Sequence, residues 1–427
     1  MGLLAADQQI KGVPGMRIPP LPPRWVRTSV ALSVLAAFGL STAACSSGSS
    51  SAAAPAGLSG TQAGAPANPQ YAAEEKAAEA SLQPSPGSFL AGKDNESVIG
   101  STTPPNGDIN PYAIWPVTRT VGSVTSGDVL VDDFNNSSNN QGTGTTIVDM
   151  HVGGGQSVFA SLPSTVPGCT GGVGLTTAMV QLKTGWVIVG SLPSTDGKLD
   201  TAGAGCLLVL SPTGKLAGTI AGSYLDGPWD ATVQDDGDTA TLFVSNTLIG
   251  VGANTASTVD QGDVVRLTLS QTATTPPKVT AETQVASGLP EAPDAAAFVK
   301  GPTGLALGSS GTLYVADNLG NRIATVPDAL SRTTSAGAGT TLSEGGQLAD
   351  PLGLALAPDG DLLAANSRNG KVVEITPAGK QVGEYYADDD IGQDPPGNGD
   401  LFDVVVDQAG TGVLFVNDAT NTLELLH

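Results

Sequence analysis

Two aspartates, Asp230 and Asp403, are the residues of this 427-residue sequence whose types and positions best suit cation binding. Each opens a short apolar run, Asp-Ala-Thr-Val and Asp-Val-Val-Val, at equivalent places of a repeated pattern. Carboxylates facing a central channel, together with backbone carbonyls and waters, are ligands that Ca²⁺ prefers. We therefore predict both as candidate ligand-binding residues and Ca²⁺ ligands. The alternative is that they bond backbone N–H groups of their own turns.

Three further polar or aromatic residues are candidates for ligand binding. Trp229 precedes Asp230 and could stack on a sugar or an aromatic group, with packing as the alternative. Asp133 and Asn246 each end an apolar run. Asp and Asn at such places commonly bond the N–H groups of the following turn, which is the structural alternative for both.

Familiar catalytic arrangements are missing from the sequence. Of the two histidines, His151 lies two residues after Asp149, on the polar side of a predicted strand, and His427 is the last residue. Neither suits a Ser–His–Asp triad or a His-rich metal site. The glycine clusters at 153–155 and 171–174 lack the helix and lysine of a phosphate loop. No residue is therefore assigned as catalytic.

A repeated sequence motif indicates which strands position these residues. Leu-Tyr-Val-Ala-Asp at 313–317 follows a glycine turn and an earlier apolar run, and a further strand-like run comes after it. Five other segments contain variants of this motif: 129–133, 187–191, 242–246, 362–366 and 414–418. Repeats of about 50 residues made of short strands predict an all-β, six-bladed β-propeller of four-stranded antiparallel blades.

Residues 304–323 closely resemble the NHL-repeat family of propellers, and residues 353–375 resemble it fairly well. The upstream repeats carry long insertions, so the resemblance extends to residues 96–427 through periodicity. It implies a six-bladed ring of the kind that serves as a binding platform. The last repeat has three strands, and we predict that 96–102 pairs beside 422–426 to complete it, which removes an exposed sheet edge.

One face of such a ring carries the connections between blades and those between second and third strands. The latter are long in the first three repeats, at 134–144, 192–204 and 247–261, and short in the others. An acidic connection at 387–400 lies on the same face. We expect a ligand to bind on this loop-rich face, because binding residues concentrate on loops held by a rigid scaffold.

The N-terminal region has the pattern of an export signal. Two arginines precede a short apolar run at 30–40 that ends in small residues, which predicts a signal peptide over 1–44. Cys45 follows two alanines, as in bacterial lipoprotein signals, and this resemblance implies a lipid on Cys45 at the cell envelope. Simple secretion is the alternative. Either Met1 or Met16 could be the true start.

Residues 45–95 are rich in Ser, Ala, Gly and Pro and predict a disordered tether before the propeller at 96–427. In an exported protein the two remaining cysteines, Cys169 and Cys206, can form a disulfide, which we predict. The alternative is two free thiols.

The net charge of −22 disfavours nucleic acid and anionic membrane surfaces as partners, so membrane contact is expected only through the lipid. We expect a monomer. Two functions stay open. The favoured one is binding of a protein, peptide or glycan on the loop-rich face. The alternative is a Ca²⁺-dependent hydrolase, lactonase or lyase that uses the central channel.

Overall fold

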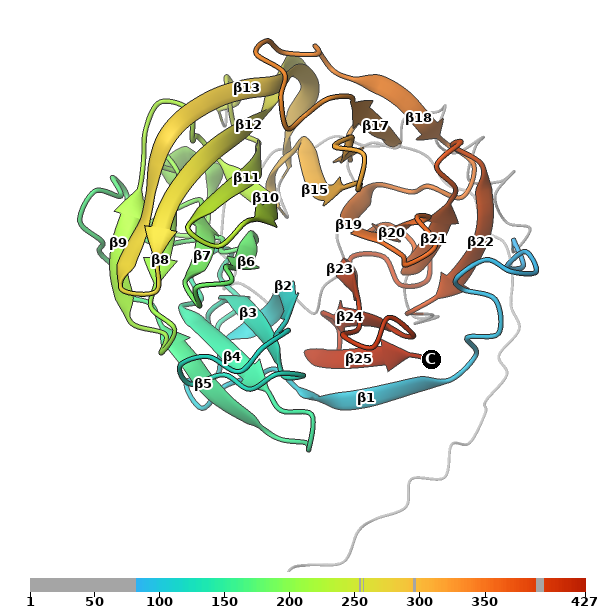
Figure 1. The fold of residues 1–427 in the computed structure, drawn as a ribbon, viewed down its shortest axis with the longest axis horizontal. Helices are drawn as coiled ribbons and strands as arrows, with labels where there is room; N and C mark the ends of the chain where they lie inside the picture. Colours follow the sequence, from blue (N-terminus) through green and yellow to red (C-terminus); the bar gives the residue numbers. More distant parts are fainter. Residues whose placement is uncertain (1–81, 253–254, 256, 295–296, 389–394) are drawn as a thin grey trace, which may run out of the picture. The chain divides into compact units, whose positions relative to one another are not determined.

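The computed structural model describes residues 82–252, 255, 257–294, 297–388 and 395–427. Six antiparallel sheets surround a common axis as the blades of a β-propeller (Figure 1). The predicted fold class is confirmed. In the described chain the only helical element is a 3₁₀ turn, η1 (Leu199–Thr201). No described helix is long and apolar enough to cross a membrane.

The first three blades follow in chain order, each from its innermost strand outwards. Blade 1 contains β2 (Ile109–Pro116), β3 (Val129–Asn135), β4 (Thr146–Met150) and β5 (Gln156–Ser161). Blade 2 contains β6 (Met179–Gln181), β7 (Val187–Ser191), β8 (Cys206–Leu210) and β9 (Leu216–Ile220). Blade 3 contains β10 (Pro228–Asp235), β11 (Thr239–Asn246), the long pair β12 (Val259–Thr272) and β13 (Thr275–Asp294), and a fifth strand, β14 (Phe298–Lys300).

The last three blades complete the ring. Blade 4 contains β15 (Pro302–Leu307), β16 (Leu313–Asp317), β17 (Arg322–Val326) and β18 (Thr340–Glu344). Blade 5 contains β19 (Pro351–Leu356), β20 (Leu362–Asn366), β21 (Lys371–Ile375) and β22 (Gln381–Tyr386). Blade 6 contains β23 (Leu401–Val406), β24 (Val413–Asn417) and β25 (Thr422–Leu426), together with β1 (Glu96–Ser101).

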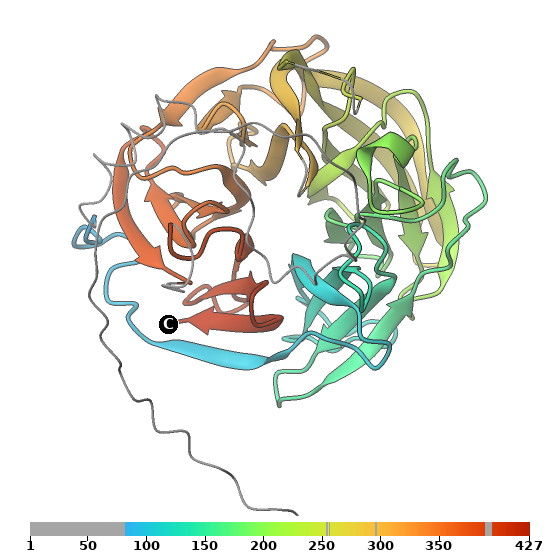
Figure 2. The ribbon, with the colours of Figure 1, turned by 180° about the vertical axis from the view of Figure 1, so that it is seen from behind.

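The first and last strands lie in the same blade. β1 pairs antiparallel with β25, with Glu96 opposite Leu426 and Ser101 opposite Thr422. Both views of the ring show β1 along the outer edge of blade 6 (Figures 1 and 2). The predicted pairing of 96–102 beside 422–426 is therefore observed.

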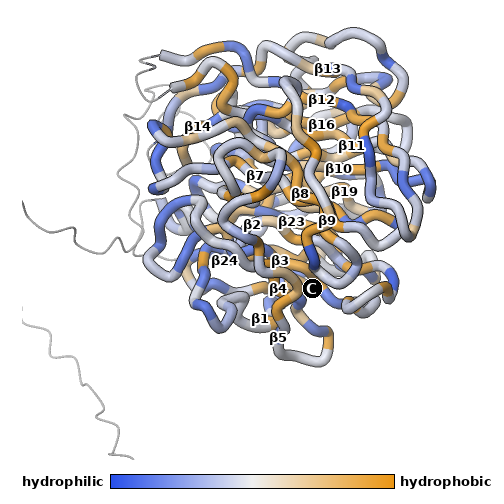
Figure 3. The backbone as a smooth tube through the Cα atoms, turned by 90° about the vertical axis from the view of Figure 1, so that its left-hand side faces the viewer, coloured by the Kyte–Doolittle hydropathy of each residue, from blue (hydrophilic) through white to orange (hydrophobic). Residues whose placement is uncertain are grey.

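The core lies between neighbouring blades. Every residue of β3, β7, β20 and β24 is buried, because each strand is flanked within its sheet and covered on both faces. Leu130 of blade 1 packs with Val187 and Leu208 of blade 2, for example. Hydrophobic stretches follow the strands and hydrophilic ones the connections (Figure 3). Burial of each such side chain contributes about 1.5–3 kcal/mol.

A disulfide and an N-terminal segment make specific contacts with the blades. Cys169 and Cys206 form the predicted disulfide in blade 2. Residues 82–95, which composition assigns to the tether, contact blade 5. The N–H groups of Phe89 and Leu90 donate to the carboxylate of Glu374 at 2.6 and 2.8 Å, and Leu90 is buried. Cys45 and the signal segment lie outside the described residues.

Candidate functional site

Innermost strands carry a recurring irregularity close to the predicted cation ligands. The register of β2, β10, β15, β19 and β23 with its neighbouring strand shifts near the start of each strand. In β10 the shift spans Pro228 and Asp230, and in β23 it spans Leu401 and Val404. A bulge of this kind frees backbone N–H groups from the ladder and redirects side chains.

Three aspartates, here called the axial carboxylates, accept hydrogen bonds from backbone N–H groups in or next to these shifts: Asp132, Asp230 and Asp403. The two oxygens of Asp230 accept from the N–H of Ala231 at 2.7 Å and of Leu305 at 2.6 Å. Because Leu305 belongs to β15, this side chain links blade 3 to blade 4.

Asp403 repeats the arrangement between blades 6 and 1. Its oxygens accept from the N–H of Val404 at 2.8 Å and of Ile114 at 3.2 Å. Asp132, one strand further from the axis, accepts from Ala113 at 2.6 Å, and its other oxygen is buried without a hydrogen-bond partner. These bonds explain part of why the sequence places carboxylates here.

Burial raises the pKa of all three axial carboxylates. It raises the pKa of Asp403 to about 7 and that of Asp132 to about 8. Backbone N–H donors oppose the shift at Asp403, and the Thr176 side chain, followed by backbone N–H donors, opposes it at Asp132. Burial also raises the pKa of Asp230 well above its usual value, and the nearby charge of Asp403 raises it further. No ion pair within the described ranges involves these three residues. Such carboxylates are typical of acid–base or cation-binding sites.

Trp229 lies in an aromatic cluster beside Asp230. Its indole N–H donates to the hydroxyl of Tyr112 at 2.8 Å, and the Tyr112 ring stacks on Phe402 with centroids 5.4 Å apart. Only 3% of Trp229 is exposed. Its ring therefore packs within the protein and leaves almost no surface for a ligand in this arrangement.

Asp133 and Asn246 are buried at the ends of β3 and β11. The hydroxyl of Thr102 donates to Asp133 at 3.0 Å, and burial raises the pKa of that carboxyl to about 9. The side-chain amide of Asn246 donates to Asp263 at 2.9 Å. The structure does not bring these two residues together, and both hold neighbouring chain segments.

A pocket of about 460 Å³ opens between blades 2 and 3 on the loop-rich face. Its lining includes Ala204 and Ile249, from two of the long connections, and the side chains of Tyr224, Asp226 and Asp263. Burial raises the pKa of both aspartates. The pocket has the size of small-ligand sites. The sequence did not reveal it, because its walls come from separate connections.

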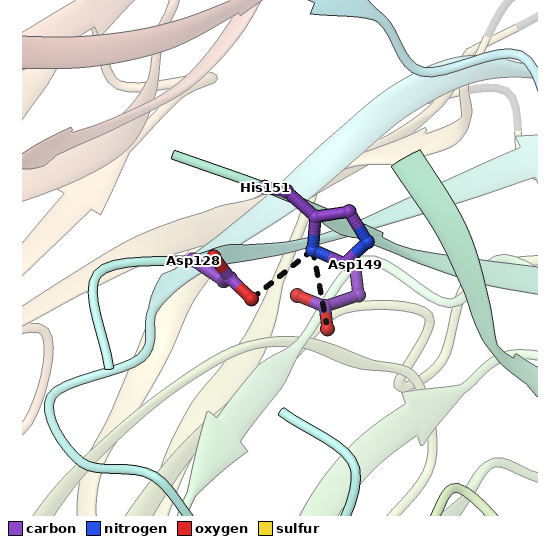
Figure 4. Close-up of side chains that lie close together, drawn as sticks. All are labelled: Asp128, Asp149 and His151. Carbon is purple, nitrogen blue, oxygen red and sulfur yellow. Dashed lines mark hydrogen bonds and ion pairs between the residues drawn. The ribbon is translucent and has the colours of Figure 1, made fainter. Parts of the chain in front are cut away.

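Asp128, Asp149 and His151 form a cluster in blade 1 (Figure 4). The Nδ1 atom of His151 lies 3.1 Å from the carboxylate of Asp128 and 3.9 Å from that of Asp149. Burial raises the pKa of Asp149 to about 6, and the charge of Asp128 adds to this effect. The spacing of Asp149 and His151 was the only sequence signal for the cluster; Asp128 joins through strand pairing.

Comparisons with known proteins identify no family for the chain. No family model and no curated protein matches it. Among solved structures, a gluconolactonase from Xanthomonas campestris is similar at 15% identity, covering 70% of this chain and 81% of its own, with a TM-score of 0.46. A virginiamycin B lyase from Staphylococcus aureus is similar at 17% identity, covering 78% and 84%, with a TM-score of 0.43.

The calcium-binding protein regucalcin from Agrobacterium tumefaciens is similar at 13% identity, covering 73% of this chain and 90% of its own, with a TM-score of 0.45. These three proteins are named as a gluconolactonase, a lyase and a calcium-binding protein. Likeness at this level shows the fold alone.

Proposed function

We propose that the protein is a Ca²⁺-dependent hydrolase, lactonase or lyase whose site lies at the ring axis. The observation that carries this proposal is that Asp230 and Asp403, on the innermost strands β10 and β23, are half-buried carboxylates with no ion-pair partner within the described ranges. Burial raises the pKa of both side chains, and the charge of Asp403 raises the pKa of Asp230 further. A divalent cation would offset both effects, because an opposite charge favours the ionised form.

The hydrogen bonds of the two aspartates are compatible with a cation. Each of their four oxygens accepts one backbone N–H, which leaves a lone pair on every oxygen. Ca²⁺ takes six to eight oxygen ligands in flexible geometry, so waters and a substrate oxygen would have to supply most of the remainder. A bound cation would polarise a carbonyl of the substrate.

A Ca²⁺ titration combined with a hydrolysis assay tests this proposal. We expect Ca²⁺ to raise the melting temperature and to support hydrolysis of a member of a panel of simple γ- and δ-lactones. Both effects should disappear in the double variant Asp230→Asn plus Asp403→Asn. The proposal would be overturned if the protein bound no Ca²⁺ and if Ca²⁺ did not change the rate of hydrolysis of any lactone in the panel.

A matched control separates chemistry from stability. The hydroxyl of Thr177, two residues before β6, donates to the carbonyl of Trp229 at 2.6 Å, so it links blades 2 and 3 without a carboxylate. Thr177→Val should lower the melting temperature but keep the response to Ca²⁺. If this variant also lost the Ca²⁺ response, a loss of stability alone would be enough to explain the effect of replacing Asp230 and Asp403.

Binding of a glycan or peptide on the loop-rich face is the second candidate, and the 460 Å³ pocket favours it. Its tyrosine and two aspartates offer a stacking surface and hydrogen-bond acceptors. A glycan array probed with the wild type and with Tyr224→Ala tests this candidate. It requires a hit that the variant loses; an empty array, or hits that the variant retains, would argue against a glycan ligand.

Export with a lipid on Cys45 is the proposed localisation, supported by the signal pattern of the sequence. Cys45→Ser should move the protein from the membrane fraction to the soluble or secreted fraction of a bacterial host. An unchanged distribution would favour simple secretion. The variant does not alter the ring, so axial activity should be unaffected.

A further inference from the structure

We propose that Asp128, Asp149 and His151 form a second site, which binds a divalent transition-metal ion such as Zn²⁺. Asp128 directly precedes β3, and His151 directly follows β4. The long connection between β3 and β4 joins the opposite ends of these strands. The cluster therefore lies on the face opposite the loop-rich face, apart from the ring axis.

Strand pairing explains why Asp128 converges with Asp149 and His151, although His151 lies 23 residues further along the chain. Leu130 pairs with Asp149, and Val129 pairs with Met150, so the next pair outward places Asp128 opposite His151. Directly opposed residues of antiparallel strands point to the same side, as do residues two apart along one strand. All three side chains are thus directed to one side of blade 1 (Figure 4).

The distances suit one small ion. Nitrogen and oxygen ligands of tetrahedral zinc, at about 2.0–2.2 Å from the metal, are separated by roughly 3.3 Å. His151 Nδ1 lies 3.1 Å from Asp128 Oδ2 and 3.9 Å from Asp149 Oδ2. All three ligand atoms lie within 4.8 Å of one another. Coordination therefore requires the ligand atoms to move by at most about 1.5 Å, which side-chain adjustment can supply.

A second, independent observation concerns Asp149. Its side chain is 2% exposed, and its Oδ1 atom is buried without a hydrogen-bond partner. An unpartnered buried carboxylate oxygen is costly, and each such group in a native protein calls for an explanation. A cation bound by both oxygens of Asp149, together with Asp128 and His151, would give Oδ1 a partner.

The surroundings hold the ligands in place but leave one side open. The N–H of Val152 donates to the second oxygen of Asp128 at 3.2 Å, and the N–H of His151 donates to the carbonyl of Gly155 at 3.0 Å. Such outer contacts orient metal ligands. The His151 side chain is 38% exposed, so an ion can enter and water can complete its coordination. One imidazole with two carboxylates favours Zn²⁺ over Ca²⁺.

Zinc binding to the mature chain, measured by equilibrium dialysis, tests this inference. We expect one Zn²⁺ per chain that depends on this cluster, with affinity at least tenfold lower in His151→Ala and in Asp149→Asn. Because His151 is partly exposed, its replacement should leave the fold intact. Co²⁺ in place of Zn²⁺ should give a visible absorption band that His151→Ala abolishes.

The chain offers matched controls. His427 is the only other histidine and contacts Ser97 at the end of the ring, so His427→Ala should bind zinc normally. Among the residues that the structure describes, Asp359, Asp361 and Glu374 form another acidic group of comparable compactness, and Asp361→Asn should also bind normally. Absence of stoichiometric zinc binding, or equal losses in His151→Ala and a control, would overturn the inference.

Failure here is distinguishable from failure at the ring axis. The axial proposal depends on Ca²⁺ and on Asp230 and Asp403, whereas this one depends on Zn²⁺ and on His151. The double axial variant should retain zinc binding. Loss of zinc binding in that variant would show that the two sites are not separate and would overturn the present assignment.

Discussion

The carboxylate of Asp403 accepts a hydrogen bond from the backbone N–H of Ile114 at 3.2 Å. This bond joins the innermost strand of the last blade to that of the first. Asp230 joins blades 3 and 4 in the same way. The candidate cation ligands thus also satisfy backbone N–H groups of the innermost strands. These bonds give both side chains a role in stability, from which the proposed role in binding must be separated by experiment.

Replacement of Asp403 by Asn should destabilise the ring. The amide retains one acceptor oxygen, so the N–H of either Val404 or Ile114 loses its partner. The expected loss is about 1–2 kcal/mol in the free energy of unfolding, measured by chemical denaturation. Glu344→Gln, at an exposed position, serves as the control and should change little. An unchanged stability for Asp403→Asn would contradict the linking role.

Gly353 is predicted to tolerate no side chain, because blades 5 and 6 approach closely there. A Cβ atom at this position would lie 2.5 Å from a carboxylate oxygen of Asp403 and 2.7 Å from its Cα. Gly353→Ala should cost about 1–3 kcal/mol through overpacking. Gly360→Ala is not a suitable control because of its positive φ; Gly218→Ala, which meets no atom within 4 Å, is suitable. Equal effects of the two changes would argue against the close approach.

Glu291 should make stability fall as pH rises. Burial raises its pKa from 4.5 to about 9, with smaller contributions from Asp226 and Asp263. Between these values the folded state retains a proton that the unfolded state releases, so unfolding gains favour with increasing pH. Glu291→Gln removes this dependence.

Between pH 5.5 and 7.5 the free energy of unfolding of the wild type should therefore fall relative to that of Glu291→Gln. The shift should reach at most about 2.7 kcal/mol, since one proton contributes about 1.36 kcal/mol per pH unit. Denaturation at both pH values measures it. Glu282→Gln, at an exposed position, should show no such shift. A pH-independent difference for Glu291→Gln would contradict the protonated state.

The disulfide should stabilise blade 2. It closes a loop with a sequence separation of 37, and removing a constraint of this size costs about 2–4 kcal/mol. Cys169→Ser plus Cys206→Ser should lower the melting temperature accordingly. A reducing agent should lower the wild-type value and leave the double variant unchanged. No difference between wild type and variant under oxidising conditions would contradict a stabilising role.

Residues 82–95 should contribute to stability despite their composition. Leu90 is 1% exposed and packs with blades 5 and 6, so Leu90→Ala should cost about 2–5 kcal/mol. Val98 on β1 is 64% exposed, and Val98→Ala should have little effect. A small effect at Leu90 would show that this segment is not part of the folded body.

Composition misplaces the start of the folded region for a physical reason. Residues 82–95 hold few apolar side chains, which predicts disorder when the segment is considered alone. Two of these side chains and their N–H groups find partners on blade 5, chiefly Glu374. Such partners lie nearly 300 residues away, and no local pattern reveals them.

The sequence by itself determined the ring. A repeat of short strands fixes the number of blades, because each blade needs neighbours to bury both of its faces. The repeat also located the innermost positions of Asp230 and Asp403 and the pairing of β1 with β25. Cys169 and Cys206, together with the expectation of export, were enough to predict their bond.

Only the tertiary structure decided what lies beside each of these residues. The hydrogen bonds from Leu305 to Asp230 and from Ile114 to Asp403 depend on the packing of neighbouring blades. The convergence of Asp128 with Asp149 and His151 depends on the register between β3 and β4. Periodicity records which side of a strand a residue faces, but ligand geometry depends on distances between strands, and these are fixed only when the sheets assemble.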